Sequence, residues 1–363
     1  MVKPEVLEQL RKEIGAEDLD LSWLDKPAAK QGLRVVPGRR GLTLEDISVD
    51  GYGDPEEETR NHSGRMRGAA PREDAQHLAR HWSNKAESWS DSAMMLYEEG
   101  LQRQWSSATD IPWEDMPELD EDLELAMSQL CTFLTQVEFI AGDVPAKFAP
   151  NISAEHFEVG LFLATQIMDE ARHLDVFRKR ALANGIGLLQ AGPGAVGLLT
   201  AESFIEMTAT LHLVGEGFIQ SMFRMGELFA HSEMDKRIFR LAAQDESRHV
   251  AFGVMHMKHL LTTEPERREE IHTYLDRMEG QVGSTPNQSG LTGGGDTSEA
   301  LAILLGGGKS ESQLNEGYKK LMGIRRRQFN EYVHRLDVVG LGDRRERLPE
   351  RIRPYIDPPR NGS

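Results

Sequence analysis

The stretch QDESRHVAFG, residues 244–253, contains the motif Asp-Glu-x-Arg-His, and the stretch MDEARHLDVF, residues 168–177, contains the same motif again. On an α-helix, residues three positions apart project from one side with their Cβ atoms about 5–6 Å apart, so the glutamate and the histidine of each copy can bind one ion. A buried glutamate is costly unless it is paired, hydrogen-bonded or bound to a metal. We therefore expect one metal centre between two helices, each with its own pair: Glu170 with His173, and Glu246 with His249.

The Glu-x-x-His spacing alone is a weak signal, because the chain contains it four times. The other two copies are Glu269 with His272 and Glu331 with His334, and both lie in strongly charged or polar segments. A solvated helix face is the better interpretation of those two copies. The first two copies differ from them in the preceding aspartate, the arginine before the histidine, and the flanking apolar residues that bury the helix face.

The composition disfavours several classes of protein. Among the 363 residues, 42 lysines and arginines against 59 aspartates and glutamates give a net charge of −17, which disfavours nucleic acid and anionic membranes as partners. Cys131 is the single cysteine, so no intramolecular disulfide forms and a reducing compartment is expected. The N-terminal segment has no apolar signal core, and no run approaches eighteen apolar residues. The sequence therefore predicts a cytoplasmic protein with neither a nucleic acid nor a membrane as partner.

The chain divides into three regions by composition. Residues 1–72 are rich in glycine, proline and charge, which predicts an irregular N-terminal extension. Residues 73–278 have the apolar spacing of long helices, and residues 279–363 contain a Gly/Ser-rich loop, one helix and a charged tail. The composition of residues 279–310 indicates a flexible loop, and a lid over a site would have the same composition. In an all-α fold, helices are expected near 73–105, 118–149, 154–184, 197–230, 233–262 and 311–337.

A metal centre of this kind needs further carboxylates from two partner helices, and the spacing tests which residues supply them. If two antiparallel helices meet at one height, their connecting turn falls midway between their ligands. For Glu138 and Glu170 the midpoint is 154, within the turn-like sequence APNISAEH, where Ser153 can cap the next helix. The apolar face around Glu138 predicts a buried carboxylate, and a lone glutamate paired with an arginine or a lysine is the alternative.

The same test selects a glutamate on the third helix. For Glu216 and Glu246 the midpoint is 231, within AHSEMD, where Ser232 followed by Asp235 resembles a capping box. Three competing glutamates place the turn inside a helix and therefore fail: Glu202, Glu206 and Glu227. Hard carboxylates with one imidazole per ion suit iron or manganese, whereas structural zinc usually recruits cysteines, of which this chain has one.

The ordered set Glu138, Asp169-Glu170-x-x-His173, Glu216 and Asp245-Glu246-x-x-His249 resembles the ferritin-like di-iron carboxylate superfamily. The branch in question contains the ribonucleotide reductase small subunit, R2-like oxidases and bacterial multicomponent monooxygenases. The likeness covers roughly residues 80–262, and the segment YEEGLQRQWSSATDIPWE resembles the lead-in to the first ligand helix of R2-like proteins. It implies a ferritin-like four-helix bundle with additional flanking helices and a centre of two iron ions, with an Mn/Fe pair as the alternative. A homodimer is also implied, because R2-like proteins commonly pair.

The resemblance also implies a role for each candidate ligand: Glu170 and Glu246 bridge the irons, Glu138 and Glu216 are more terminal, and His173 and His249 bind one iron each. Asp169 and Asp245 would accept a hydrogen bond from the histidine of the opposite helix and hold it in its metal-binding tautomer. Arg172 and Arg248 would bind carboxylates, with surface salt bridges as the alternative.

Three positions bear on which subgroup the chain resembles. Phe177 stands where radical-generating small subunits usually have a tyrosine, and none of the six tyrosines lies between residues 118 and 262. Gln220 stands where the multicomponent hydroxylases typically have a threonine, one turn after Glu216. The N-oxygenases show an additional histidine near the site, and His212 lies one turn before Glu216; a satisfied core histidine is its favoured role, with an extra ligand as the alternative. Ordinary core packing is the favoured interpretation of Phe177 and three further residues, with an apolar pocket over the metals as the alternative: Phe139, Ile219 and Phe223.

These implications favour an O2-activating non-haem di-iron oxidase or oxygenase that acts on a small organic substrate by hydroxylation, N-oxidation or desaturation. Such an enzyme uses O2 and needs an electron donor, either a reductase or a ferredoxin-type protein. A radical or electron-transfer protein similar to the ribonucleotide reductase small subunit is the first alternative, and the missing tyrosine argues against it. Non-catalytic iron handling is the second, and the long segments at both ends argue mildly against a storage cage.

Overall fold

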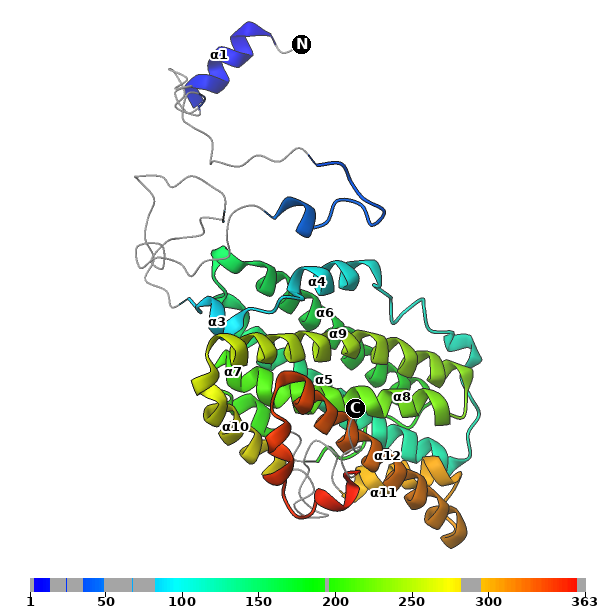
Figure 1. The fold of residues 1–363 in the computed structure, drawn as a ribbon. Coiled ribbons are helices and arrows are strands. Elements are labelled where there is room, and N and C mark those ends of the chain that lie inside the picture. Colours follow the sequence, from blue (N-terminus) through cyan, green and yellow to red (C-terminus); the bar gives the residue numbers. More distant parts are fainter. Residues whose placement is uncertain are drawn as a thin grey trace.

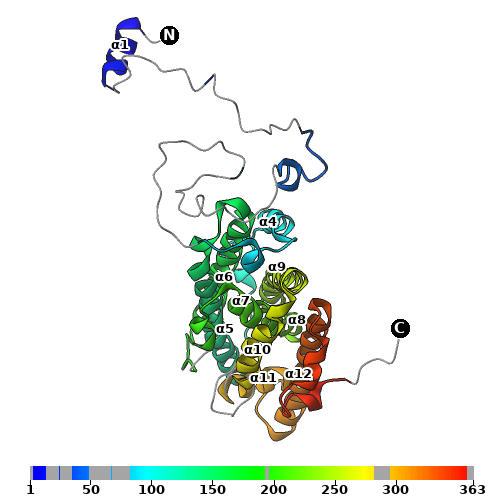
Figure 2. The same ribbon diagram turned by 60° about the vertical axis from the view of Figure 1, so that its left-hand side comes forward.

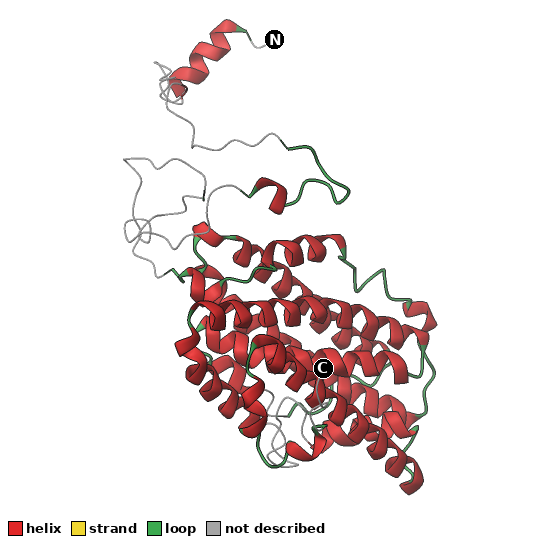
Figure 3. Ribbon diagram, viewed as in Figure 1, coloured by secondary structure: helices red, strands yellow, loops and turns green. Residues whose placement is uncertain are grey.

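The computed structural model describes residues 3–13, 24, 35–48, 67, 82–192, 196–281 and 295–357. Over these residues the chain forms helices joined by turns and loops, and no β-strand is present (Figure 3). The prediction of an all-α fold is confirmed. No described helix combines the length and the apolar character needed to span a membrane.

Four long helices form the centre of the molecule and pack as two antiparallel pairs (Figure 1). The first pair is α5 (Glu121–Phe148) with α6 (Glu158–Ala183), and the second is α8 (Gly217–Phe229) with α9 (Glu233–Thr263). Directly upstream of α8 lie α7 (Phe204–Met207) and a π-helix over Thr208–Glu216. π-Helical turns are rare in proteins, and those that occur are often found at functional sites.

Further helices cover this bundle. α12 (Glu311–Val339) lies along the outer side of α8 and α9, and α11 (Gly295–Gly306) packs against α5 and α12 (Figure 2). α10 (Arg268–Gln281) contacts the π-helix, and α4 (Ala93–Gln102) lies against α6 and α9. The remaining described α-helices are α1 (Pro4–Glu13) and α3 (Lys85–Ser88).

The two hairpin turns lie where the midpoint argument places them. The α5–α6 turn runs through residues 149–157, and Ser153 Oγ accepts a hydrogen bond from the Glu155 backbone N–H at 3.1 Å. In the α8–α9 turn, Ser232 Oγ accepts a hydrogen bond from the Asp235 backbone N–H at 2.9 Å, as an N-cap residue does. These turns determine which residues of the two paired helices lie opposite each other.

The described apolar interior forms two large clusters along the helix axes and a third, small cluster around Met225 and Leu321. On α5, Val137 belongs to one buried cluster and Ile140 to the other, and on α9 the corresponding residues are Ala243 and Phe252. The candidate ligands of both helices lie between these positions. A polar layer therefore crosses the bundle, with an apolar core on either side of it.

The helix expected over residues 73–105 is interrupted. Its described part forms α3 and α4, whereas residues 73–81 and most of the expected extension over 1–72 lie outside the described residues. Trp89 ends α3 in an extended conformation, and its indole Nε1–H donates to Asp91 Oδ1 at 2.7 Å. The chain resumes helical structure only at Ala93, where α4 begins.

The segment expected as a loop over residues 279–310 contains a helix, α11. Its apolar run ALAILL buries Leu305 and neighbouring residues against the bundle. The close contact with α12 requires a glycine at position 317, because a Cβ atom on Gly317 would lie 1.9 Å from the Ala302 carbonyl oxygen. Of residues 279–310, for which a lid was the alternative, residues 282–294 lie outside the described residues.

Candidate metal centre

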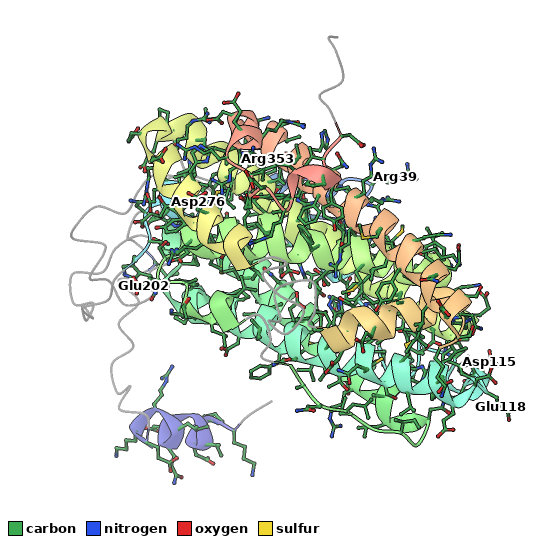
Figure 4. The ribbon with its side chains drawn as sticks, turned by 90° about the horizontal axis from the view of Figure 1, so that it is seen from below. Arg39, Asp115, Glu118, Glu202, Asp276 and Arg353 are labelled. Carbon is green, nitrogen blue, oxygen red and sulfur yellow. The ribbon has the colours of Figure 1, made fainter. Side chains whose placement is uncertain are left out.

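Four glutamates from four helical segments meet inside the bundle. Glu138 comes from α5, Glu170 from α6, Glu216 from the end of the π-helix and Glu246 from α9, and none is more than 2 % exposed. Surface acidic side chains lie at the periphery instead, as those labelled in Figure 4 do: Asp115, Glu118, Glu202 and Asp276. Four buried carboxylates lose their hydration and repel one another, so they require compensating positive charge.

Two histidines complete two overlapping groups of potential metal ligands. The first group is Glu138, Glu170, His173 and Glu246, and the second is Glu170, Glu216, Glu246 and His249. Within each group the ligand atoms all lie within 4.8 Å of one another. Glu170 and Glu246 belong to both groups, so the arrangement offers two adjacent ion positions with two shared carboxylates.

Each histidine turns its Nδ1 atom toward the glutamates. The distances from His173 Nδ1 are 3.3 Å to Glu138, 3.4 Å to Glu170 and 3.2 Å to Glu246. The distances from His249 Nδ1 are 3.0 Å to Glu170, 3.2 Å to Glu246 and 3.9 Å to Glu216. All six candidate ligands predicted from the sequence are therefore brought together.

Several carboxylate oxygens of this cluster have no hydrogen-bond partner among the described residues: both oxygens of Glu170, and Oε1 of Glu138 and of Glu246. An unsatisfied buried acceptor is costly, and a bound cation satisfies it. Four carboxylates and two imidazoles form a donor set suited to divalent iron and manganese. Cys131 lies in an apolar cluster outside both groups. The residues thus fit a pair of divalent metal ions.

Burial and mutual repulsion determine the protonation of the metal-free cluster. Burial, followed by the charges of the two shared glutamates, raises the pKa of Glu216 well above its usual value. Burial also raises the pKa of Glu138, although a hydrogen bond with His173 opposes the shift. Burial lowers the pKa of His249, but the neighbouring carboxylates, Glu170 first, outweigh it and leave this pKa well above its usual value. Metal binding therefore has to displace protons, because ligands bind in their deprotonated form.

Two aspartates hold the outer nitrogen of each histidine. His173 Nε2–H donates to Asp245 Oδ2 at 3.2 Å, and His249 Nε2–H donates to Asp169 Oδ2 at 3.3 Å. Each aspartate thus contacts the histidine of the other helix. Because an ionised carboxylate only accepts hydrogen bonds, Nε2 keeps its proton, and Nδ1, which faces the glutamates, is the nitrogen that gives up its proton to bind an ion.

Two arginines neutralise these aspartates. Arg248 Nη2 donates to Asp169 Oδ2 and to Asp245 Oδ1, in each case at 2.7 Å. Arg172 Nη2 also contacts both, donating to Asp169 and, at 3.1 Å, to Asp245. Both arginines are buried, so the alternative of surface salt bridges does not apply.

Sequence reasoning missed Trp105 as part of this network. Its indole Nε1–H donates to Asp245 Oδ2 at 2.7 Å, and its ring stacks on the His173 ring at a centroid distance of 6.3 Å. The Arg172 guanidinium lies over the same indole, 5.4 Å from the ring centroid. The available signal was the position of Trp105 within the lead-in segment before α5, but no spacing rule connects it to Asp245.

The aromatic residues expected to line a pocket take different positions. Phe177 and Phe223 are buried side by side in one of the two cores, with ring centroids 5.2 Å apart, and Phe223 meets the His173 ring edge-on. Both interpretations of Phe139, core packing and a pocket wall, are wrong: this side chain is 61 % exposed, because adjacent helix residues project about 100° apart. Ile219 borders the cavity described below.

His212 and Gln220 lie outside both ligand groups. His212 is fully buried, and its Nε2–H donates to Gln166 Oε1 at 3.0 Å. Gln166, which sequence reasoning missed, donates in turn from Nε2 to Glu216 Oε1 at 3.2 Å. Gln220 donates to Ser247 Oγ at 2.8 Å on the outer side of α8 and α9.

The other two Glu-x-x-His motifs are remote from the cluster. Glu269 is exposed and pairs with Arg347 at 2.9 Å, as expected for a solvated face. His272 differs from that expectation, because it is buried beneath Arg344, whose guanidinium lies 3.2 Å from His272 Nδ1.

A small cavity of about 20 Å³ adjoins the cluster on the side of Glu138 and Glu216. Apart from these two carboxylates its lining is apolar or glycine: Val137, Ala141, Leu198, Leu211, Gly215 and Ile219. A volume of this size accommodates about one water-sized molecule.

No protein-family model matches the chain, and no curated protein matches it. Among solved structures, the chain is similar to a mutant of an R2-like ligand-binding oxidase with an aerobically reconstituted Fe/Fe cofactor. The two are 18% identical with a TM-score of 0.54, and the match covers 70% of this chain and 95% of that chain. A mutant of an R2-like ligand-binding oxidase with an aerobically reconstituted Mn/Fe cofactor is 19% identical with a TM-score of 0.52 and the same coverage. The chain therefore has the fold of these R2-like oxidases, a ferritin-like helical bundle with flanking helices, as the sequence predicted.

Proposed function

We propose that the chain binds two metal ions, iron/iron or manganese/iron, inside the four-helix bundle and uses them with O2 to oxidise a small organic substrate. The observation that supports this most directly is the pair of overlapping ligand groups that share Glu170 and Glu246. The similar solved structures are described as oxidases with Fe/Fe and Mn/Fe cofactors. In this proposal the remaining ligands are Glu138 and His173 on one ion, and Glu216 and His249 on the other.

The metal pair, when bound, supplies electrons for the reduction of O2. The residues of the chain set the conditions for this chemistry. The four glutamates neutralise two divalent cations, so the loaded centre is compatible with an apolar interior. Asp169 and Asp245 keep the proton on Nε2 of each histidine and leave Nδ1 for an ion. The apolar cores on both sides exclude water from the centre.

The cavity beside Glu138 and Glu216 supports an approach of O2 and substrate from that side. It accommodates a molecule of the size of water or O2, so an organic substrate requires side chains such as Leu211 and Ile219 to move. Hydroxylation, N-oxidation and desaturation each take two electrons from the substrate and two from outside when O2 is fully reduced. A reductase or a ferredoxin-type protein is therefore the proposed electron donor.

A radical or electron-transfer protein is the second candidate function. Hydrogen bonds connect the oxidisable indole of Trp105 through Asp245 to His173, which favours electron passage to the centre. Phe177, at the place of the expected tyrosine, argues against a stable radical beside the metals. An electron paramagnetic resonance spectrum after oxygenation separates the two candidates, because a stable radical signal would favour this one.

Anaerobic loading with ferrous iron, followed by metal counting and an optical spectrum on exposure to O2, tests the first proposal. We expect about two ions per chain and a new absorption band after O2 is added. Glu170→Ala combined with Glu246→Ala should abolish loading. Glu269→Ala is the matched control, because it alters a Glu-x-x-His motif outside the cluster. Clearly fewer than two ions per wild-type chain, or normal loading of the double variant, would overturn the di-metal proposal.

A further inference from the structure

The two copies of the motif differ one helical turn upstream of their glutamates. Gln166 precedes Glu170 at that distance on α6, whereas Ala242 precedes Glu246 on α9. The terminal glutamates differ in the same way: His212 lies one turn before Glu216, and Leu134 lies one turn before Glu138. The polar pair of Gln166 and His212 therefore breaks the symmetry of an otherwise doubled site.

Gln166 and His212 form a buried relay that ends on Glu216. Gln166 Nε2 donates to Glu216 Oε1 at 3.2 Å, and Gln166 Oε1 accepts the Nε2–H of His212 at 3.0 Å. Both side chains are fully buried. Because the amide presents its NH2 group to Glu216, its oxygen faces His212 and needs a donor, so the His212 proton is on Nε2.

The packing around His212 holds this relay in place. His212 and Glu216 belong to the same π-helix, and α9 passes close to the imidazole at Gly253. A Cβ atom at that glycine would lie 2.3 Å from His212 Cβ, so glycine is needed for the approach. The Phe252 ring meets the imidazole edge-on at a centroid distance of 5.6 Å. The imidazole therefore has little freedom to turn away from Gln166.

The relay distinguishes the two carboxylate oxygens of Glu216. Oε1 is engaged by Gln166, whereas Oε2 faces the ligand cluster, 3.9 Å from His249 Nδ1. Glu138 has no equivalent restraint, because its Oε1 has no hydrogen-bond partner among the described residues and Ala242 and Leu134 offer no donor. The two ion positions are therefore chemically unequal.

Resting on the proposed di-metal function, we infer that Gln166, oriented by His212, is a positioning residue that restricts Glu216 to binding its ion through Oε2 alone. Glu138 retains both oxygens for the other ion. The ion held by Glu216 and His249 consequently keeps a coordination position for a small external ligand. Glu216 lines the small apolar cavity, as Glu138 does, so a small ligand in this cavity would lie next to the carboxylate that binds this ion.

Azide, titrated into the Co(II)-loaded protein and followed by visible absorption, probes this coordination position. Gln166→Met keeps the side-chain volume but removes the donor, so both oxygens of Glu216 become available to the ion and compete with azide. The Kd for azide should rise roughly 10-fold, at the lower end of the effects typical of residues that orient metal ligands. Thr165→Val, at the neighbouring buried position on α6, is the matched control and should leave this Kd unchanged.

Variants of His212 provide an independent test if Gln166→Met does not fold. His212→Phe removes the donor that orients the amide and should raise the Kd for azide, whereas His212→Gln supplies a donor again and should restore it. A Kd within about two-fold of the wild-type value in Gln166→Met or His212→Phe, with both cobalt ions bound, would overturn the inference. Failure of the wild-type protein to bind two cobalt ions would instead contradict the proposed function.

Discussion

Replacement of Arg248 by methionine removes a buried cation that joins two aspartates. Arg248 is 2 % exposed, and its Nη2 donates to Asp169 and to Asp245, in each case at 2.7 Å. Removing one partner of a buried ion pair leaves an uncompensated charge and typically costs about 3–5 kcal/mol. Arg172 still contacts both aspartates, so we expect a loss of about 3 kcal/mol in the free energy of unfolding of the metal-free protein.

The same replacement has a second consequence, because the two aspartates also bind the histidines of the cluster. Groups that orient metal-binding histidines typically contribute 10–100-fold to metal affinity, so Arg248→Met should weaken Co(II) binding roughly 10-fold or more. Arg180→Met is the matched control. Arg180 is 1 % exposed and donates to Glu124 and to Asp235, in each case at 2.6 Å, but neither carboxylate belongs to the cluster.

Two measurements separate these effects. Urea unfolding of the metal-free proteins reports the loss of stability, and Co(II) titration followed by visible absorption reports the affinity. Both variants should lose stability by similar amounts, whereas only Arg248→Met should lose affinity. Equal losses of affinity in the two variants would refute the reasoning, because metal binding would then follow global stability rather than the orientation of the histidines.

Three further predictions concern protonation and packing. Burial lowers the pKa of His256 from 6.5 to about 4, so the unfolded chain takes up a proton below about pH 6.5 that the folded protein binds only near pH 4. The free energy of unfolding should therefore fall by about 3 kcal/mol as the pH is lowered from about 6.5 to about 4. His256 Nδ1–H donates to the Trp89 carbonyl oxygen at 2.7 Å, and His256→Asn keeps a donor there but does not titrate, so it should remove most of this loss in urea unfolding. Burial raises the pKa of Glu138 and Glu216, so Co(II) affinity should increase from about pH 6 to about pH 8 as fewer protons must be displaced, and a pH-independent affinity contradicts this. Gly253→Ala places a Cβ atom 2.3 Å from His212 Cβ and should lower the melting temperature through an overpacking cost of about 1–3 kcal/mol; unchanged melting would show that the π-helix yields freely.

The glutamates of the cluster could be predicted from the sequence because the relevant information is local. Helical periodicity places each Glu-x-x-His pair on one face, and turn residues fix the height at which paired helices meet. Glu138 and Glu216 follow from that height, and the structure places both beside the doubled motif. The same argument does not fix how neighbouring side chains project, which is why Phe139 was expected to be buried, in the core or in a pocket, but is exposed.

Contacts between distant parts of the chain could not be predicted in this way. The hydrogen bonds of Trp105 with Asp245 and of Gln166 with Glu216 join segments that meet only in the folded molecule. No periodicity relates such positions, although each is specific in its donor and acceptor. α11 was missed for a different reason. The surrounding glycines and serines dominate the local composition, whereas tertiary packing makes its short apolar run helical.

The polar layer between the two apolar cores has a consequence for the mechanics of the bundle. The same four helices contribute residues to both cores. Within the polar layer, these helices are held together by charge compensation rather than by apolar contact. With the proposed ions bound, the centre is a cross-link with four arms that closes loops of about 30 to 50 residues. The binding free energy of the ions then adds to the folding free energy of the whole domain. Removal of the ions by a chelator should therefore destabilise all four helices together, because each helix contributes a ligand to the same centre.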